Sequence, residues 1–118
     1  MNIEEIRDFC LGLPGTTEDI KWENNLCFSV REKLFLLISL DEVPPGASFK
    51  VKTDNFDAVT AREGFRQAPY FARGMWVSLD DIGRPDIKEW EAFIRTSYEL
   101  VRAKLPARVR KELDGGSL

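Results

Sequence analysis

The chain has 118 residues, with 17 Lys and Arg against 20 Asp and Glu and a formal net charge of -3 at pH 7. This length suits one domain, and 43% hydrophobic with 31% charged residues is typical of a soluble globular protein rather than a disordered or fibrous one. The chain contains no His, which excludes the commonest general base, the commonest metal ligand and every His-containing catalytic triad.

The first predicted element is an amphipathic helix that begins after Asn2. Apolar residues recur at helical spacing over Ile3–Leu13, and Glu5 stands three residues after Asn2 as its capping-box partner. Glycine and proline then end the helix, and we expect residues 14–25 to form a polar loop.

Three strands with short connections are predicted next. Leu26–Val30 alternates apolar and polar side chains, and Ser48–Lys52 does the same. Leu34–Leu40 is nearly continuously apolar, which predicts a central strand covered on both faces. Short connections between consecutive strands imply an antiparallel meander.

The second half of the chain alternates helices with one strand. A helix capped by Thr53 or Asp54 is expected to run to about Glu63. Residues 65–73 are predicted to be irregular, and Gly74–Leu79 is predicted to be a fourth strand.

The longest predicted helix opens at Asp86, with Glu89 as its capping partner, and its apolar stripe runs to Leu105. Pro106 ends or kinks that helix, and one further turn can follow it. The expected fold class is therefore α+β: an antiparallel sheet of about four or more strands packed, in two layers, against N-terminal and C-terminal helices. We expect one domain over residues 1–113 and a flexible tail over residues 114–118.

Cysteine usage and the N-terminus indicate a cytoplasmic protein. Cys10 and Cys27 are too few for a disulfide scaffold and lie in apolar contexts, so both are expected in the core, with a redox pair as the alternative. The N-terminus lacks a secretory signal pattern, and the longest apolar run, Leu34–Ile38, is too short to span a bilayer.

Enzymatic motifs are absent from the sequence. There is no CxxC pair, no Walker A loop and no GxGxxG, and no nucleophile–base pair or metal-ligand cluster can be identified. The adjacent carboxylates Glu18 and Asp19, in the segment LPGTTED, fit a structural turn or, alternatively, acid–base or metal-ligand roles. We therefore expect no catalytic residue, no metal ligand and no cofactor.

Basic and aromatic side chains lie on the strands predicted at Ser48–Lys52 and Gly74–Leu79, and three arginines precede the second of these strands. Such a mixture suits nucleic acid, through phosphate contact and stacking, although a solvated charged face would look the same. The residues concerned are Lys50, Lys52, Arg62, Arg66, Arg73 and Trp76.

Two further features leave alternatives open. The basic stretch from Arg102 to Lys111 either complements a helix dipole or forms a patch for an anionic partner. Trp22 stands in the polar loop, where an exposed aromatic side chain sometimes marks a binding surface.

Several segments taken together resemble the MmcQ/YjbR family of small bacterial proteins. The segments are LPGTTED, LCFSV, KLFLLISL, FKVKTDNFDAVTAREGF, RGMWVSL and IRTSYELVRAKLPARVR. The resemblance as a whole spans the chain from about Ile3 to Arg110. The resemblance implies a frataxin-like, double-wing fold and DNA binding. Within it, Lys50 and Lys52 match the basic third strand, Trp76 matches the strand tryptophan, and Arg73 falls in the basic stretch before it. The family often has a His at the position of Met75.

Our leading interpretation is a monomeric, non-enzymatic DNA-binding module without a cofactor or membrane association. Its contacts would be made by Lys50, Lys52, Arg66, Arg73 and Trp76. The alternative is a protein-interaction or metal-linked module that uses the acidic first helix, as in frataxin-like folds. That helix carries Glu4, Glu5 and Asp8 on its outer face.

Overall fold

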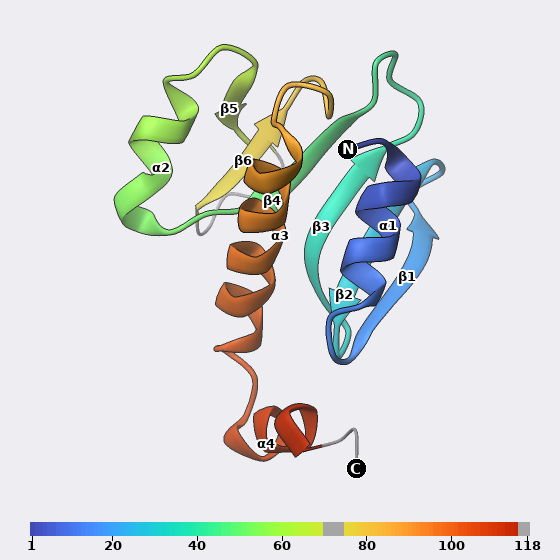
Figure 1. Ribbon diagram of the computed structural model, residues 1–118, viewed down its shortest axis with the longest axis vertical. Helices are drawn as coiled ribbons and strands as arrows, with labels where there is room; N and C mark the ends of the chain where they lie inside the picture. The colour runs from blue at the N-terminus through green and yellow to red at the C-terminus, as the bar shows by residue number, and fades with distance from the viewer. Residues whose placement is uncertain (70–74, 116–118) are drawn as a thin grey trace.

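A computed structural model describes residues 1–69 and 75–115 of the chain. Four helices and six strands are found in these residues (Figure 1). In chain order they are α1 (Ile3–Leu11), β1 (Thr16–Lys21), β2 (Asn25–Val30), β3 (Lys33–Ser39), β4 (Gly46–Lys50), α2 (Thr53–Thr60), β5 (Phe65–Gln67), β6 (Trp76–Leu79), α3 (Ile87–Arg102) and α4 (Ala107–Gly115).

The strands form one antiparallel sheet in the order β1-β2-β3-β4-β6-β5. The first four are consecutive neighbours, so the predicted meander is confirmed and has one more strand than expected. β6 then pairs with β4, and β5 takes the outer edge. The predicted α+β fold class is confirmed.

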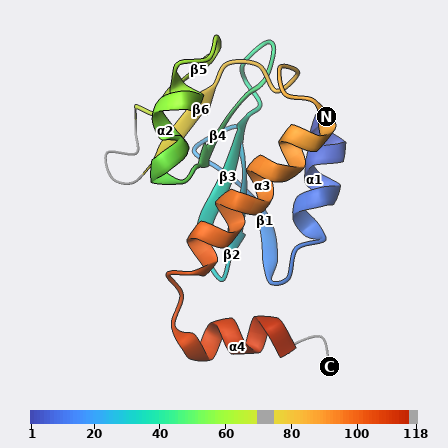
Figure 2. The ribbon, with the colours of Figure 1, turned by 60° about the vertical axis from the view of Figure 1, so that its left-hand side comes forward.

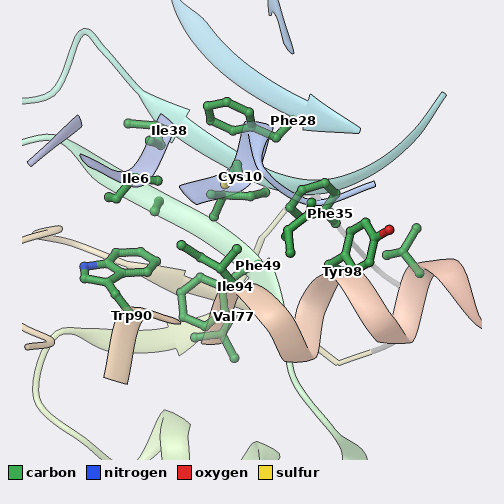
Figure 3. Close-up of a cluster of buried hydrophobic side chains, with 14 of the residues drawn as sticks. Ile6, Cys10, Phe28, Phe35, Ile38, Phe49, Val77, Trp90, Ile94 and Tyr98 are labelled. Carbon is green, nitrogen blue, oxygen red and sulfur yellow. The ribbon is translucent and has the colours of Figure 1, made fainter. Parts of the chain in front are cut away.

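Helices α1 and α3 cover one face of the sheet, and we call the other side of the sheet the open face (Figures 1 and 2). The two helices and the sheet enclose an aromatic and aliphatic core, drawn in Figure 3. Trp90 of α3 lies completely buried in that core, and its Nε1–H donates to the carbonyl of Ile82 at 2.6 Å. The predicted apolar stripe is confirmed at Trp90, Ile94 and Val101, which are buried, whereas Ile87 is 53% exposed and Leu105 lies beyond the end of α3.

Two of the three predicted N-terminal helix caps are confirmed. The capping box of α1 is confirmed, because Asn2 Oδ1 accepts from the Glu5 N–H at 2.8 Å and Glu5 returns the bond. Asp86 caps α3 by accepting from the Glu89 N–H at 2.8 Å. The predicted cap of α2 was wrong: Lys52 occupies that position and makes no side-chain capping bond.

Three predicted boundaries were also wrong. Residues 16–21 form β1 instead of a loop, because Thr, Thr and Ile favour strands, and the exposed edge of a sheet leaves no hydrophobic alternation to recognise. Residues 65–67 form the short strand β5 instead of irregular structure. Helix α4 extends to Gly115, so residues 114 and 115, expected in a flexible tail, are helical.

Gly15 leaves room for α4 to pack close to the turn before β1. Its φ of +76° is a conformation that L side chains rarely adopt, and a Cβ there would stand 2.4 Å from Leu113 Cδ2 of α4. Glycine at this position therefore allows both the turn into β1 and the close approach of Leu113.

No helix within residues 1–69 and 75–115 has both the length and the apolar character needed to cross a membrane.

Candidate nucleic-acid interface

Three lysines converge on a pocket of about 380 Å³ beside the C-terminal end of α3. We call it the lysine pocket, and the residues that line it are Lys33, Leu34, Lys50, Trp76, Val101, Lys104 and Leu105. The lysines come from β3, from β4 and from the segment after α3. The apolar side chains supply the rest of the wall, and no Asp or Glu within residues 1–69 and 75–115 lines the pocket.

The pocket forms where β3 and β4 stop pairing. Their ladder runs from Ser39 and Gly46 to Leu36 and Phe49, so Phe35 and Lys50 lie beyond its last pair. Ser97 of α3 joins these two residues: its hydroxyl donates to the Phe35 carbonyl at 2.6 Å and accepts from the Lys50 N–H at 2.9 Å. The helix thereby satisfies the backbone groups that the sheet leaves unpaired and fixes the position of Lys50.

The charge of Lys50 is destabilised in this setting. Burial and the neighbouring ammonium group of Lys104 together lower the pKa of Lys50 to about 8. None of Lys33, Lys50 and Lys104 forms an ion pair with a carboxylate in the described part of the chain. Like charges brought together without a counter-charge are unfavourable, and a bound anion would relieve that repulsion.

Trp76 lies directly opposite Lys50 in the register of β4 and β6. Residues that face each other across a ladder project to the same side of the sheet, so Trp76 forms a wall of the lysine pocket beside Lys50. Only 8% of Trp76 is exposed. Its ring therefore shapes the pocket and offers little surface for stacking.

The remaining residues of the expected DNA contact set are distributed differently. Arg66 pairs in register with Ser78 and so lies on the same side of the sheet as Lys50, but it lines a different pocket. Lys52 lines a third pocket between α2 and α3, so Lys50 and Lys52 do not share a site. Arg73 lies outside the described residues.

Arg62 and Glu18 have structural partners. The guanidinium group of Arg62 makes two hydrogen bonds, of 2.9 and 2.8 Å, to the Glu89 carboxylate and lies over the Phe65 ring. Glu18 receives two bonds of 2.6 Å from Arg7, which tie β1 to α1 and hold the pKa of the Glu18 carboxyl below its usual value. These contacts account for both side chains without a ligand.

The basic C-terminal stretch interacts with the end of α3. Arg110 Nη1 donates to the Ala103 carbonyl at 3.2 Å, and Arg102 forms an ion pair with Asp114. A cation on the last carbonyl groups of a helix matches the dipole interpretation of this stretch.

The acidic face of α1 provides no metal site in the structure. Glu5 is engaged in the capping box, which leaves Glu4 and Asp8 exposed on the helix. Within residues 1–69 and 75–115, no group of three or more Cys, Asp or Glu side chains could hold a metal ion.

Sequence reasoning missed Lys33 and Lys104 as members of the site. Lys33 begins a strand after a tight turn, and Lys104 belongs to the basic stretch that we assigned to the helix dipole or to a separate patch. The pairing of β3 with β4 brings residues 33 and 50 to neighbouring strands, and the crossing of α3 over the sheet adds residue 104. No spacing along the chain signals that crossing.

Comparison with known proteins gives a family and a fold. The family model described as YjbR matches residues 11–100. A Deinococcus radiodurans protein whose domain is described as DUF419 has a crystal structure similar to this fold, with a TM-score of 0.84 and 21% identity over 96% of this chain and 88% of that chain. A Pseudomonas syringae protein is similar with a TM-score of 0.69 and 19% identity over 86% of this chain and 99% of that chain. No curated protein matches this chain.

Proposed function

The chain belongs to the MmcQ/YjbR family, a family of small domains of uncharacterised function that is not a known enzyme family, and from this premise we propose that it is a non-enzymatic DNA-binding module. The observation that carries the proposal is the lysine pocket. Three cations from three separate segments surround it, and no carboxylate lines it among the residues that the structure describes. In this proposal the pocket receives phosphate groups of the DNA backbone.

The physical argument begins with the charge of the chain as a whole. A protein with a net charge of -3 has no general attraction for DNA, so a local cluster of cations must supply the affinity. Lysine ammonium groups donate charge-assisted hydrogen bonds to phosphate oxygens, and these bonds are stronger than neutral ones. Binding also releases counterions from the DNA, which makes the affinity depend on salt.

The state of Lys50 fits an anion-binding role. Its pKa of about 8 keeps this lysine protonated at neutral pH, while its nearness to Lys104 makes that state costly. A phosphate placed between the two ammonium groups would favour the charged forms of both. The free protein thus carries a repulsion that the complex would remove.

The proposed contact surface includes Arg66 on the open face, outside the lysine pocket. Arg66 is exposed on the same side of the sheet as Lys50 and forms no ion pair in the described part of the chain. Arg73 remains in the proposed set on the sequence argument alone. Trp76 is proposed as a supporting side chain of the pocket rather than a stacking platform, and Lys52 as a peripheral charge.

The test is a titration of fluorescently labelled duplex and single-stranded DNA at two salt concentrations. We expect binding at low salt that weakens as salt rises, because phosphate contacts dominate. Absence of binding at low salt, or binding that does not depend on salt, would overturn the proposal. Tighter binding of single-stranded DNA would favour unpaired strands over duplex as the ligand.

A further inference from the structure

A second pocket, separate from the lysine pocket, occupies the open face. Its volume is about 500 Å³, within the usual range for small-molecule sites. We call it the sheet-face pocket. Its walls include Trp22 from the turn between β1 and β2 and Pro69 from the segment after β5, while strands β2 to β6 form its floor.

The floor carries three serine hydroxyl groups without a hydrogen-bond partner among the described residues. Ser48 and Ser78 face each other across β4 and β6, and Ser39 of β3 lines the same pocket. None of these three hydroxyls makes a hydrogen bond within the described part of the chain, and none is a fully buried unsatisfied atom. They are therefore available to a molecule in the pocket.

Two opposite charges stand at different parts of the pocket. The Glu42 carboxylate lies over Gly46 at the start of β4, where a Cβ on the glycine would stand 2.5 Å from Glu42 Oε1. Arg66 reaches the pocket from β5, two strands away. The two side chains form no ion pair with each other or with any other described residue.

Trp22 contributes an aromatic side chain to the wall of the pocket. Trp22 is 65% exposed and has a φ of 49°, a region that bulky residues seldom occupy. Its turn is held by Asn25, whose amide group donates to the Trp22 carbonyl at 3.0 Å. Glu23, Arg31 and Glu32 also have positive φ, so this conformation belongs to the tight turns on either side of β2.

We propose that the sheet-face pocket binds a small aromatic molecule that carries both a carboxylate and an amino group, as an aromatic amino acid does. Arg66 would hold the carboxylate through paired hydrogen bonds, and Glu42 would accept from the ammonium group. The ring would lie against Trp22, and the serine hydroxyls would satisfy the remaining polar atoms. A neutral nucleoside would leave both charges of the pocket without a counterpart.

The experiment is titration of the 15N-labelled full chain, followed by NMR, with five probes. These are L-tryptophan, L-phenylalanine, phenylacetate, phenethylamine and adenosine. We expect the two amino acids to bind most tightly and to shift the Trp22 indole signal and the backbone amide signals of Ser48 and Ser78. Phenylacetate and phenethylamine, which each lack one charged group, should bind more weakly, by about tenfold.

Variants then test the two charges. Arg66→Gln and Glu42→Gln should each weaken L-phenylalanine binding by about tenfold, because each removes one charge-assisted contact. Arg108→Gln, which removes one positive charge from an exposed position of α4 as Arg66→Gln does from the pocket, should leave binding unchanged. The proposal is overturned if neither amino acid binds, if adenosine binds as tightly as they do, or if the shifted signals lie away from this pocket. It is also overturned if folded Arg66→Gln and Glu42→Gln proteins bind as the unaltered chain does.

Discussion

The Ser97 hydroxyl accepts a hydrogen bond of 2.9 Å from the Lys50 backbone N–H, 47 positions away in the chain. Ser97 is completely buried and also donates to the Phe35 carbonyl at 2.6 Å. This one side chain therefore closes the gap where β3 and β4 separate and fixes the backbone of the lysine pocket. Stability and the proposed site are linked at this position.

Replacing Ser97 by Ala should lower the free energy of unfolding by about 1–3 kcal/mol, because two backbone groups lose their partner in a buried place. Urea denaturation of both proteins measures the change. Ser78→Ala is the matched control, since the Ser78 hydroxyl makes no hydrogen bond in the described part of the chain, and it should change stability by less than about 0.5 kcal/mol. Equal effects of the two variants would show that the Ser97 bridge contributes nothing.

Replacing Trp90 by Ala should cost about 3–5 kcal/mol, because the ring is completely buried among the aromatic side chains of the core. Trp90→Phe should cost less, since it retains most of the packing and loses only the bond to the Ile82 carbonyl. Denaturant melts give both values. A loss under about 1 kcal/mol for Trp90→Ala would mean that this helix face does not anchor α3.

Much of this fold could be predicted from the sequence because its signals are local. The capping box at Asn2 and the apolar stripe of α3 depend on neighbours three or four residues away, and both are confirmed. Edge strands β1 and β5 could not be predicted, since exposed strands lack the alternation that burial imposes. Each of the two forms only by pairing with a later strand: β1 pairs with β2 after a turn, and β5 pairs with β6.

Fewer features of the candidate site than of the fold could be predicted from the sequence. Lys50 and Trp76 were recognised as basic and aromatic strand residues, but that they lie opposite each other is seen only in the strand register. Lys104 was not recognised, because its distance from Lys50 depends on the path of α3 over the sheet. Lys52 was placed beside Lys50 by strand alternation, but the strand ends at Lys50 and Lys52 becomes the cap of α2.

The lowered pKa of Lys50 gives stability a defined pH dependence. Between the folded-state pKa of about 8 and the ordinary value of 10.5, the unfolded chain binds a proton at Lys50 that the folded chain does not, so this residue makes stability rise with pH in that window. Below the window both states are protonated, and the charge destabilises the fold. Lys50→Met should therefore be more stable than the unaltered chain at pH 7, by a margin that shrinks towards pH 10.5.

Urea melts of both proteins at several pH values measure that margin. Lys104→Met is the complementary variant, because removing the neighbouring ammonium group should raise the pKa of Lys50 towards its ordinary value. A margin that stays constant from pH 7 to the end of the window would contradict the assignment. So would a margin that grows with pH.

The measurement that tests the central claim most directly is the salt dependence of DNA affinity in two charge-matched triple variants. One carries Lys33→Gln, Lys50→Gln and Lys104→Gln, and the other carries Lys88→Gln, Arg108→Gln and Lys111→Gln at exposed positions outside the pocket. Each loses three positive charges, so any difference reports position rather than net charge. Fluorescence anisotropy with a labelled duplex gives the slope of log K against log salt for each protein. We predict that the lysine-pocket variant loses up to about 2–3 units of that slope, while the control variant keeps the slope of the unaltered chain. Equal slopes for the two folded variants would contradict the assignment of phosphate binding to the lysine pocket.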